Sequence, residues 1–118
     1  MAALQTLGKL GAEALAAHAP AVVAKLEDSD AIVRKAAVVT LGNLGAQELA
    51  AHAPAVVAKL HDSYGFVRKA AVETLGKLDA AALSAHANAL KRTLQDDNVE
   101  VRKAGEMLLA KLSAAEAE

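Results

Sequence analysis

The sequence predicts an all-α fold: a right-handed α-solenoid in which antiparallel helix pairs stack one on the next. The first observation is a repeat, because the segment from Leu60 to Leu78 recurs 34 residues earlier and 34 residues later. A fixed period of about 20–50 residues is typical of stacked-repeat proteins. The second observation is the composition: 31 of the 118 residues are alanine, and only Tyr64 and Phe66 are aromatic. A core of small residues packs where backbones come close together, as in pairs of short helices and not in a β-sandwich.

We expect residues 1–118 to form one repeat domain. Residues 1–10 match the end of a second helix and are interpreted as a partial repeat. Three full repeats follow, and the last residues are expected to fray; the predicted boundaries are 11–44, 45–78, 79–112 and 113–118. Residues 7–40 and 41–74 are identical at 26 of 34 positions, which is typical either of recent duplication or of design.

The first helix of each repeat is expected to break or kink at its proline, which then opens the next helical segment, because proline cannot donate a backbone hydrogen bond. Pro20 and Pro54 occupy this place, and Asn88 in the third repeat predicts a straighter helix. The stretch 28–30, Asp-Ser-Asp, is a start signal for the second helix. Gly45 is expected to end that helix as a left-handed cap.

The second helix carries apolar residues with the spacing of one helical face. In the first repeat these are Val33, Ala36, Ala37, Thr40, Leu41 and Leu44. In the third repeat, three apolar positions of the earlier repeats become charged, which predicts a polar cap at the end of the stack. The replacements are Val23 and Val57 by Lys91, Ala24 and Ala58 by Arg92, and Val38 and Val72 by Glu106.

Four residues of each unit have the spacing of a known repeat consensus: a proline, an aspartate and a valine–arginine pair. They are Pro20, Asp28, Val33 and Arg34 in the first unit, with all four kept in the second and all but the proline in the third. The chain therefore resembles the HEAT-repeat family in its shorter, lyase-associated form. The resemblance implies a ladder of aspartates and arginines that bond within and between repeats: Asp28, Arg34, Asp62, Arg68, Asp96 and Arg102. Carboxylate and guanidinium groups suit this pairing.

Net charge and composition limit the cellular location and the binding partners to be expected. The net charge is −1, so bulk charge attracts neither nucleic acid nor membrane. The chain has no cysteine, no signal-peptide pattern and no apolar run of the ~20 residues that span a bilayer. We expect the cytoplasm or another reducing intracellular compartment.

No catalytic residue, cofactor or metal site is predicted. His18, His52 and His86 recur in register. One histidine per repeat would be spaced by the ~8–10 Å of helix packing, whereas zinc needs ligand nitrogens within ~2.1 Å of one ion. These histidines are therefore interpreted as polar contacts beside the helix kink.

The most direct function is non-enzymatic: a protein–protein interaction or scaffold module whose second helices present a concave surface. Tyr64 and Phe66 depart from the pattern of the other repeats, and exposed aromatic residues are typical anchors of interfaces. The partner-binding hypothesis comprises Tyr64, Phe66, Lys35, Lys69 and Lys103. Phe66 could instead replace Ile32 in the core between repeats.

Two alternatives remain open. The Arg-Lys pairs recur in every repeat, and a basic stripe of this kind could bind nucleic acid or another polyanion. The chain could also be a structural repeat fragment or a designed scaffold that self-associates end to end, as a homodimer through an uncovered N-terminal end.

Overall fold

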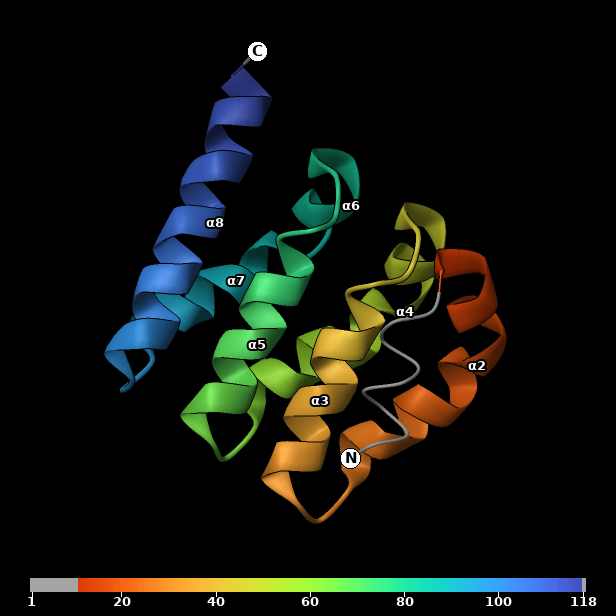
Figure 1. Ribbon diagram of the computed structural model, residues 1–118. Helices are drawn as coiled ribbons and strands as arrows, with labels where there is room; N and C mark the ends of the chain where they lie inside the picture. Colours follow the sequence, from red (N-terminus) through yellow and green to blue (C-terminus); the bar gives the residue numbers. More distant parts are fainter. Residues whose placement is uncertain (1–10, 118) are drawn as a thin grey trace.

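The computed structural model describes residues 11–117, and its helices come in pairs (Figure 1). The second helices of the pairs are α3 (Ala31–Leu41), α5 (Gly65–Leu75) and α8 (Val99–Ala117). The first helices are α2 (Ala12–Ala24), α4 (Ala46–Ala58) and the two segments α6 (Ala80–Ser84) and α7 (Ala87–Arg92). The part of the chain that the structure describes contains no strand.

The second helices follow one another along the stack, with α5 between α3 and α8 (Figure 1). Each first helix packs on the second helix of its own pair, so one apolar core runs from Leu15 to Leu112. The alanines Ala37 and Ala71 are completely buried within it, which allows neighbouring helices to approach closely. The predicted all-α solenoid is confirmed.

A short turn joins the two helices of each pair, and its geometry recurs in all three pairs. A 3₁₀ turn ends the first helix, and an aspartate in extended conformation follows it. The carboxylate of that aspartate accepts a hydrogen bond from the backbone N–H two residues later in all three pairs, at 2.9–3.0 Å. This local bond fixes the turn and directs the chain into the second helix.

The prolines were wrongly expected to break the first helices. Pro20 lies inside α2 and Pro54 inside α4, and both helices continue past them. The break occurs instead in the third pair, where Asn88 replaces the proline and the chain leaves the helix between α6 and α7. There Ser84 donates its hydroxyl to the backbone oxygen of Ala81 at 2.9 Å. Serine and asparagine side chains compete locally with helical hydrogen bonds, whereas the fixed φ of proline is itself helical.

Gly45 does not form the expected left-handed cap. It has φ −63° and ψ 162° and precedes α4 as its N-cap residue. Helix α3 ends earlier, at Leu41, and no described residue has a positive φ. The N–H groups of Asn43 and Leu44 donate to the carbonyls of Thr40 and Leu41 at 3.0 and 3.1 Å. These tight bonds satisfy the helix end without a left-handed residue.

The two ends of the chain were predicted to differ from the repeats. The partial repeat at 1–10 lies outside the described residues. The tail was expected to fray from residue 113, but α8 continues to Ala117. Alanine and glutamate favour helix strongly, and the buried Leu112 fixes the preceding turn.

The polar cap of the third repeat is seen at two of its three predicted positions. Val38 and Val72 are buried beneath the following repeat, whereas Glu106 is exposed. Lys91 is exposed at the place of the half-buried Val23 and Val57. The expectation for Arg92 was wrong: the equivalent alanines, 24 and 58, are exposed although a further repeat follows them.

Candidate interaction surface

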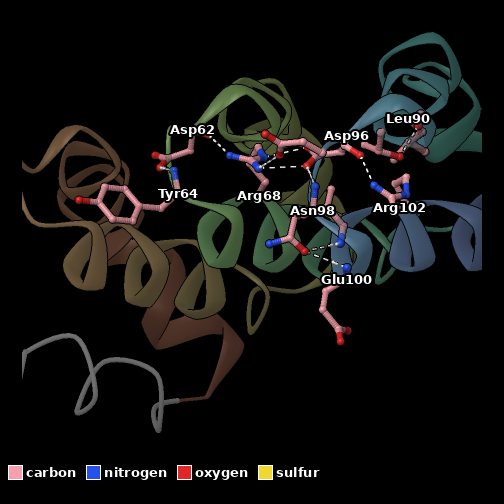
Figure 2. A network of polar contacts seen from close by, with 11 residues as sticks. Asp62, Tyr64, Arg68, Leu90, Asp96, Asn98, Glu100 and Arg102 are labelled. Atoms are coloured by element: carbon pink, nitrogen blue, oxygen red, sulfur yellow. Dashed lines mark hydrogen bonds and ion pairs between the residues drawn. The ribbon is translucent and has the colours of Figure 1, made fainter.

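An arginine from each of the first two pairs holds the aspartate of the next pair. Arg34 donates from Nε to Asp62 Oδ2 at 2.8 Å and from Nη2 to Oδ1 at 3.2 Å. Arg68 makes the same two contacts with Asp96, at 2.8 and 3.0 Å (Figure 2). The carboxylate that meets each guanidinium therefore belongs to the following repeat.

The remaining guanidinium nitrogen joins each arginine to its own pair. Nη1 donates to the backbone oxygen of the preceding aspartate, at 2.8 Å from Arg34 to Asp28 and at 2.8 Å from Arg68 to Asp62. One side chain thus links the turn of its own pair to the turn of the next. These charge-assisted bonds are half-buried and stronger than neutral ones.

The electrostatics of the two aspartates follow from this arrangement. Burial alone would raise the pKa of Asp62, but hydrogen bonds from Arg34 and from the N–H of Tyr64 outweigh it and lower the pKa. Burial likewise acts to raise the pKa of Asp96, and the bonds from Arg68 and from the N–H of Asn98 lower it. Both carboxylates are therefore charged in the folded protein at neutral pH.

The predicted ladder ends differently at its two extremes. The carboxylate of Asp28 accepts a bond from the N–H of Asp30 at 2.9 Å, and within residues 11–117 no arginine pairs with that carboxylate. Arg102 donates from Nη1 to the backbone oxygen of Asp96 at 2.7 Å, as the other two arginines do to their own turns. No carboxylate in the described chain meets its Nε or Nη2.

The three predicted lysines lie on the second helices, one per repeat. Lys69 is half-buried and pairs with Glu100 at 3.7 Å. Lys35 and Lys103 are exposed, and neither forms an ion pair among the described residues.

Three large apolar side chains are exposed where α3 and α5 begin; we call them the aromatic patch. They are Ile32, Tyr64 and Phe66, with 58%, 51% and 40% of their surfaces exposed. The rings of Tyr64 and Phe66 are 5.4 Å apart between centroids. The guanidinium of Arg34 lies 5.9 Å from the centroid of Tyr64, within reach of a cation–π contact. The alternative in which Phe66 replaces Ile32 in the core is wrong, because both side chains are exposed.

The helix start at the patch lacks the side-chain cap that the other two second helices have. Asp30 and Asn98 cap α3 and α8 with their side chains, at 2.9 Å to Ile32 N and 2.8 Å to Glu100 N. Tyr64 occupies the same place before α5 and provides no side-chain cap.

Sequence reasoning missed three exposed apolar side chains among the described residues, Val39, Val99 and Met107. Met107 of α8 is 75% exposed, more than any other large apolar residue described. It borders a shallow groove of about 330 Å³ between α5 and α8, with Glu73, Lys77 and Lys111. Lys111 reaches across this groove and donates to the backbone oxygen of Gly76 at 3.1 Å. The signal was available, because Met107 follows Lys103 by one helical turn on the same face.

The recurring histidines differ in exposure: His18 is exposed, and His52 and His86 are half-buried. Among residues 11–117, no group of three histidine, aspartate or glutamate side chains lies close enough together to bind one metal ion. No helix in the described part of the chain has the length and apolar character that crossing a bilayer would take.

The family can now be assigned. The pattern described as HEAT repeats matches residues 19–110, which is most of the chain. The chain belongs to the HEAT-repeat family. HEAT repeats generally mediate protein–protein interactions as scaffolds and are typically not enzymes. No curated protein that was compared with the chain matches it.

Proposed function

We propose that this HEAT-repeat protein is a non-enzymatic protein-interaction module whose contact surface is centred on the aromatic patch. The surface continues over the second helices, which we take to line a concave side of the stack. The observation that carries the proposal is the exposure of Ile32, Tyr64 and Phe66 where the two packed helices α3 and α5 begin. Exposed apolar groups gathered in this way mark interaction sites.

The geometry of the patch suits binding because it is held in place before a partner arrives. Arg34 lies over the ring of Tyr64 and is itself fixed by two bonds to Asp62. The ring of Phe66 packs against Tyr64. Aromatic residues with few rotatable bonds lose little conformational entropy on binding and are enriched among residues that dominate interfaces.

The lysines would form a polar rim around this centre. Lys35 lies one turn from Ile32 on α3, and Lys69 lies one turn from Phe66 on α5. Lys103 extends the same row to α8. Rim charges act mainly on the rate of association and on the choice of partner.

The test is capture of a partner from a lysate by the immobilised chain, with nuclease present. The double variant Tyr64→Asn with Phe66→Ala should lose the captured protein. The matched control is Met107→Ala, which removes an even more exposed apolar side chain from α8 and should leave capture unchanged. Equal loss in both variants, or in neither, would contradict a surface centred on the patch.

Nucleic-acid binding is the second candidate, and the contacts of the arginines weaken it. Arg34 and Arg68 are already occupied by Asp62 and Asp96, so the stripe offers mainly its lysines. This candidate predicts capture that disappears with nuclease and affinity that falls steeply with salt. End-to-end association through the N-terminal end stays a prediction, and light scattering that finds a monomer at high concentration would exclude it.

A further inference from the structure

The third arginine of the ladder is arranged as the first two are, but no carboxylate within residues 11–117 meets its Nε or Nη2. Arg34, Arg68 and Arg102 each donate Nη1 to the backbone oxygen of the aspartate six residues earlier, at 2.8, 2.8 and 2.7 Å. In the first two, Nε and Nη2 then hold an aspartate of the next repeat. In Figure 2 the side chain of Arg102 lies on the far side of Asp96 from Arg68.

The outer face of α8 corresponds to the face of α5 that packs on the third helix pair. Arg102, Glu106 and Leu109 follow one another at helical spacing. At the equivalent places in α5, Val72 and Leu75 are fully buried by the third pair. On α8, Glu106 is exposed and Leu109 is only half-buried.

An apolar hollow of about 460 Å³ continues this face toward the end of α8. Leu94, Leu109 and Leu112 contribute the apolar part of its lining, and Lys91 and Glu116 stand at its border. Helix α8 is 19 residues long, whereas α3 and α5 have 11. Within the described residues, the outer face of α8 thus combines a guanidinium edge that no carboxylate meets, one acidic position and an apolar hollow.

We propose that this end face docks an amphipathic helix of another protein, one that starts with an aspartate and carries a lysine or arginine about three turns later. The aspartate would bind Nε and Nη2 of Arg102 as Asp62 binds Arg34. The basic side chain would meet Glu106, and an apolar side chain would enter the hollow beside Leu109. The site is separate from the aromatic patch.

Glu106 is the reason for choosing another protein rather than a second copy of this chain. Within the fold, Thr74 of the next pair donates its hydroxyl to the backbone oxygen of Val38 at 3.3 Å. The side chain of Val38 is buried in the apolar core. Val38 and Glu106 are equivalent, so a repeat of this chain docked here would place a threonine beside the backbone of Glu106 and apolar residues against its carboxylate. Burying a carboxylate without a positively charged partner is strongly disfavoured. Glu106 would therefore favour a partner that carries a basic residue at this place and disfavour one that does not.

The probe is a synthetic peptide with the sequence of residues 60–78, acetylated, amidated and carrying Thr74→Lys. Its Asp62 supplies the carboxylate, and the new lysine faces Glu106. Binding to the full-length ¹⁵N-labelled chain is followed by NMR, and we expect saturable shifts of the Arg102 Nε–H signal and of the amides of α8. Asp62→Asn in the peptide, or Arg102→Gln in the chain, should weaken binding at least about tenfold, as expected for loss of a bidentate ionic contact.

Two matched variants sharpen the test. Arg92→Gln removes an exposed arginine that is not on this face, and should keep the affinity within about twofold. Glu106→Val should reverse the preference, so that the chain binds the unmodified peptide better than the Thr74→Lys peptide. Tyr64→Asn should leave peptide binding unchanged, which separates this site from the proposed function.

Three outcomes would overturn the proposal. The first is peptide affinity that neither Asp62→Asn nor Arg102→Gln changes. The second is a set of shifts confined to α3 and α5. The third is self-association, measured by sedimentation, that Arg102→Gln abolishes, because the occupant would then be a second copy of the chain.

Discussion

The middle and last helix pairs have the same backbone plan but different neighbours, and their equivalent residues differ accordingly. Val72 of α5 is 1% exposed beneath the third pair, whereas Glu106 of α8 is exposed. Arg68 holds a carboxylate of the next pair, and Arg102 holds none that the structure describes. A repeat position is therefore defined by what covers it, and exchanging residues between the two pairs tests this directly.

The largest effect is expected when the middle repeat receives the residue of the last one. Val72→Glu would bury a carboxylate among apolar neighbours without a cation, which should lower the free energy of unfolding by at least about 3 kcal/mol. The reciprocal Glu106→Val should change it by less than about 0.5 kcal/mol, because the side chain is exposed. Urea denaturation followed by circular dichroism measures both. Similar losses in the two variants would show that both positions are covered.

The ladder offers the second comparison. Arg68→Gln would leave Asp96, whose side chain is 11% exposed, without its bidentate partner, and should cost about 2 kcal/mol. Arg102→Gln removes a single described bond to a backbone oxygen and should cost less than about 1 kcal/mol. The same denaturation assay applies. Equal costs in the two variants would show that the pairing of Arg68 with the Asp96 carboxylate adds nothing to the free energy of unfolding.

A packing exchange between α8 and the 3₁₀ turn that follows α7 gives the third comparison. The last pair has Thr93 and Gly105 where the middle pair has Lys59 and Ala71. A Cβ atom at Gly105 would lie 3.0 Å from Cβ of Thr93 and collide with its hydroxyl. Gly105→Ala should therefore destabilise by about 1–2 kcal/mol although alanine favours helix. Adding Thr93→Ala should recover part of the loss in a double-mutant cycle; simple additivity would rule out the contact.

The pH dependence of stability tests the two inter-repeat carboxylates together. Their pKa values are lowered in the folded protein, so their contribution is complete above the unfolded value of about 3.9. It is lost as the pH falls through the lower folded values. We expect the free energy of unfolding to decline below about pH 4, and to decline less in Asp62→Asn. Urea denaturation at about pH 2 to 6, a range that brackets the pKa values of these carboxyls, measures the decline. If the free energy of unfolding fell equally with pH in the original protein and in Asp62→Asn, the carboxylate of Asp62 would not contribute.

Much of the fold could be predicted from the sequence, because a 34-residue period repeats every structural signal three times. The helix pairs and the turn at Asp28 follow from patterns that agree in all units. The polar cap at Glu106 could be read as a departure from that agreement. Comparing equivalent residues of the repeats predicts exposure at positions where burial depends on a following repeat.

The errors have one physical source: a local signal was judged without its surroundings. Pro20 and Pro54 were expected to break helices that accommodate them. Gly45 was assigned a left-handed cap, but Asn43 and Leu44 close the helix end with right-handed turns. The exposure of Phe66 was left open, because sequence alone does not say which side of a helix start faces solvent.

The candidate site was less predictable than the fold. Tyr64 and Phe66 could be selected only as departures from the other repeats, and nothing in the sequence shows that Arg34 lies over Tyr64. Met107 was missed although it follows Lys103 by one helical turn, because the sequence alone does not separate an exposed apolar residue of a helix from a buried one. Such residues are recognised from their exposure, which depends on tertiary packing.

The smallest effect concerns the helix starts, where the middle repeat again differs from its neighbours. Tyr64→Asn would place before α5 the residue that caps α8, and a side-chain cap contributes about 0.5–2 kcal/mol. Loss of the contacts of Tyr64 with Phe66 and Arg34 offsets part of this, so we expect a net gain of about 0.5–1 kcal/mol. The reverse change, Asp30→Tyr, should cost about 1 kcal/mol because it removes the bond to Ile32 N. If Tyr64→Asn instead lowers the free energy of unfolding, then Tyr64 stabilises the fold, and its exposure would no longer argue for a role in binding.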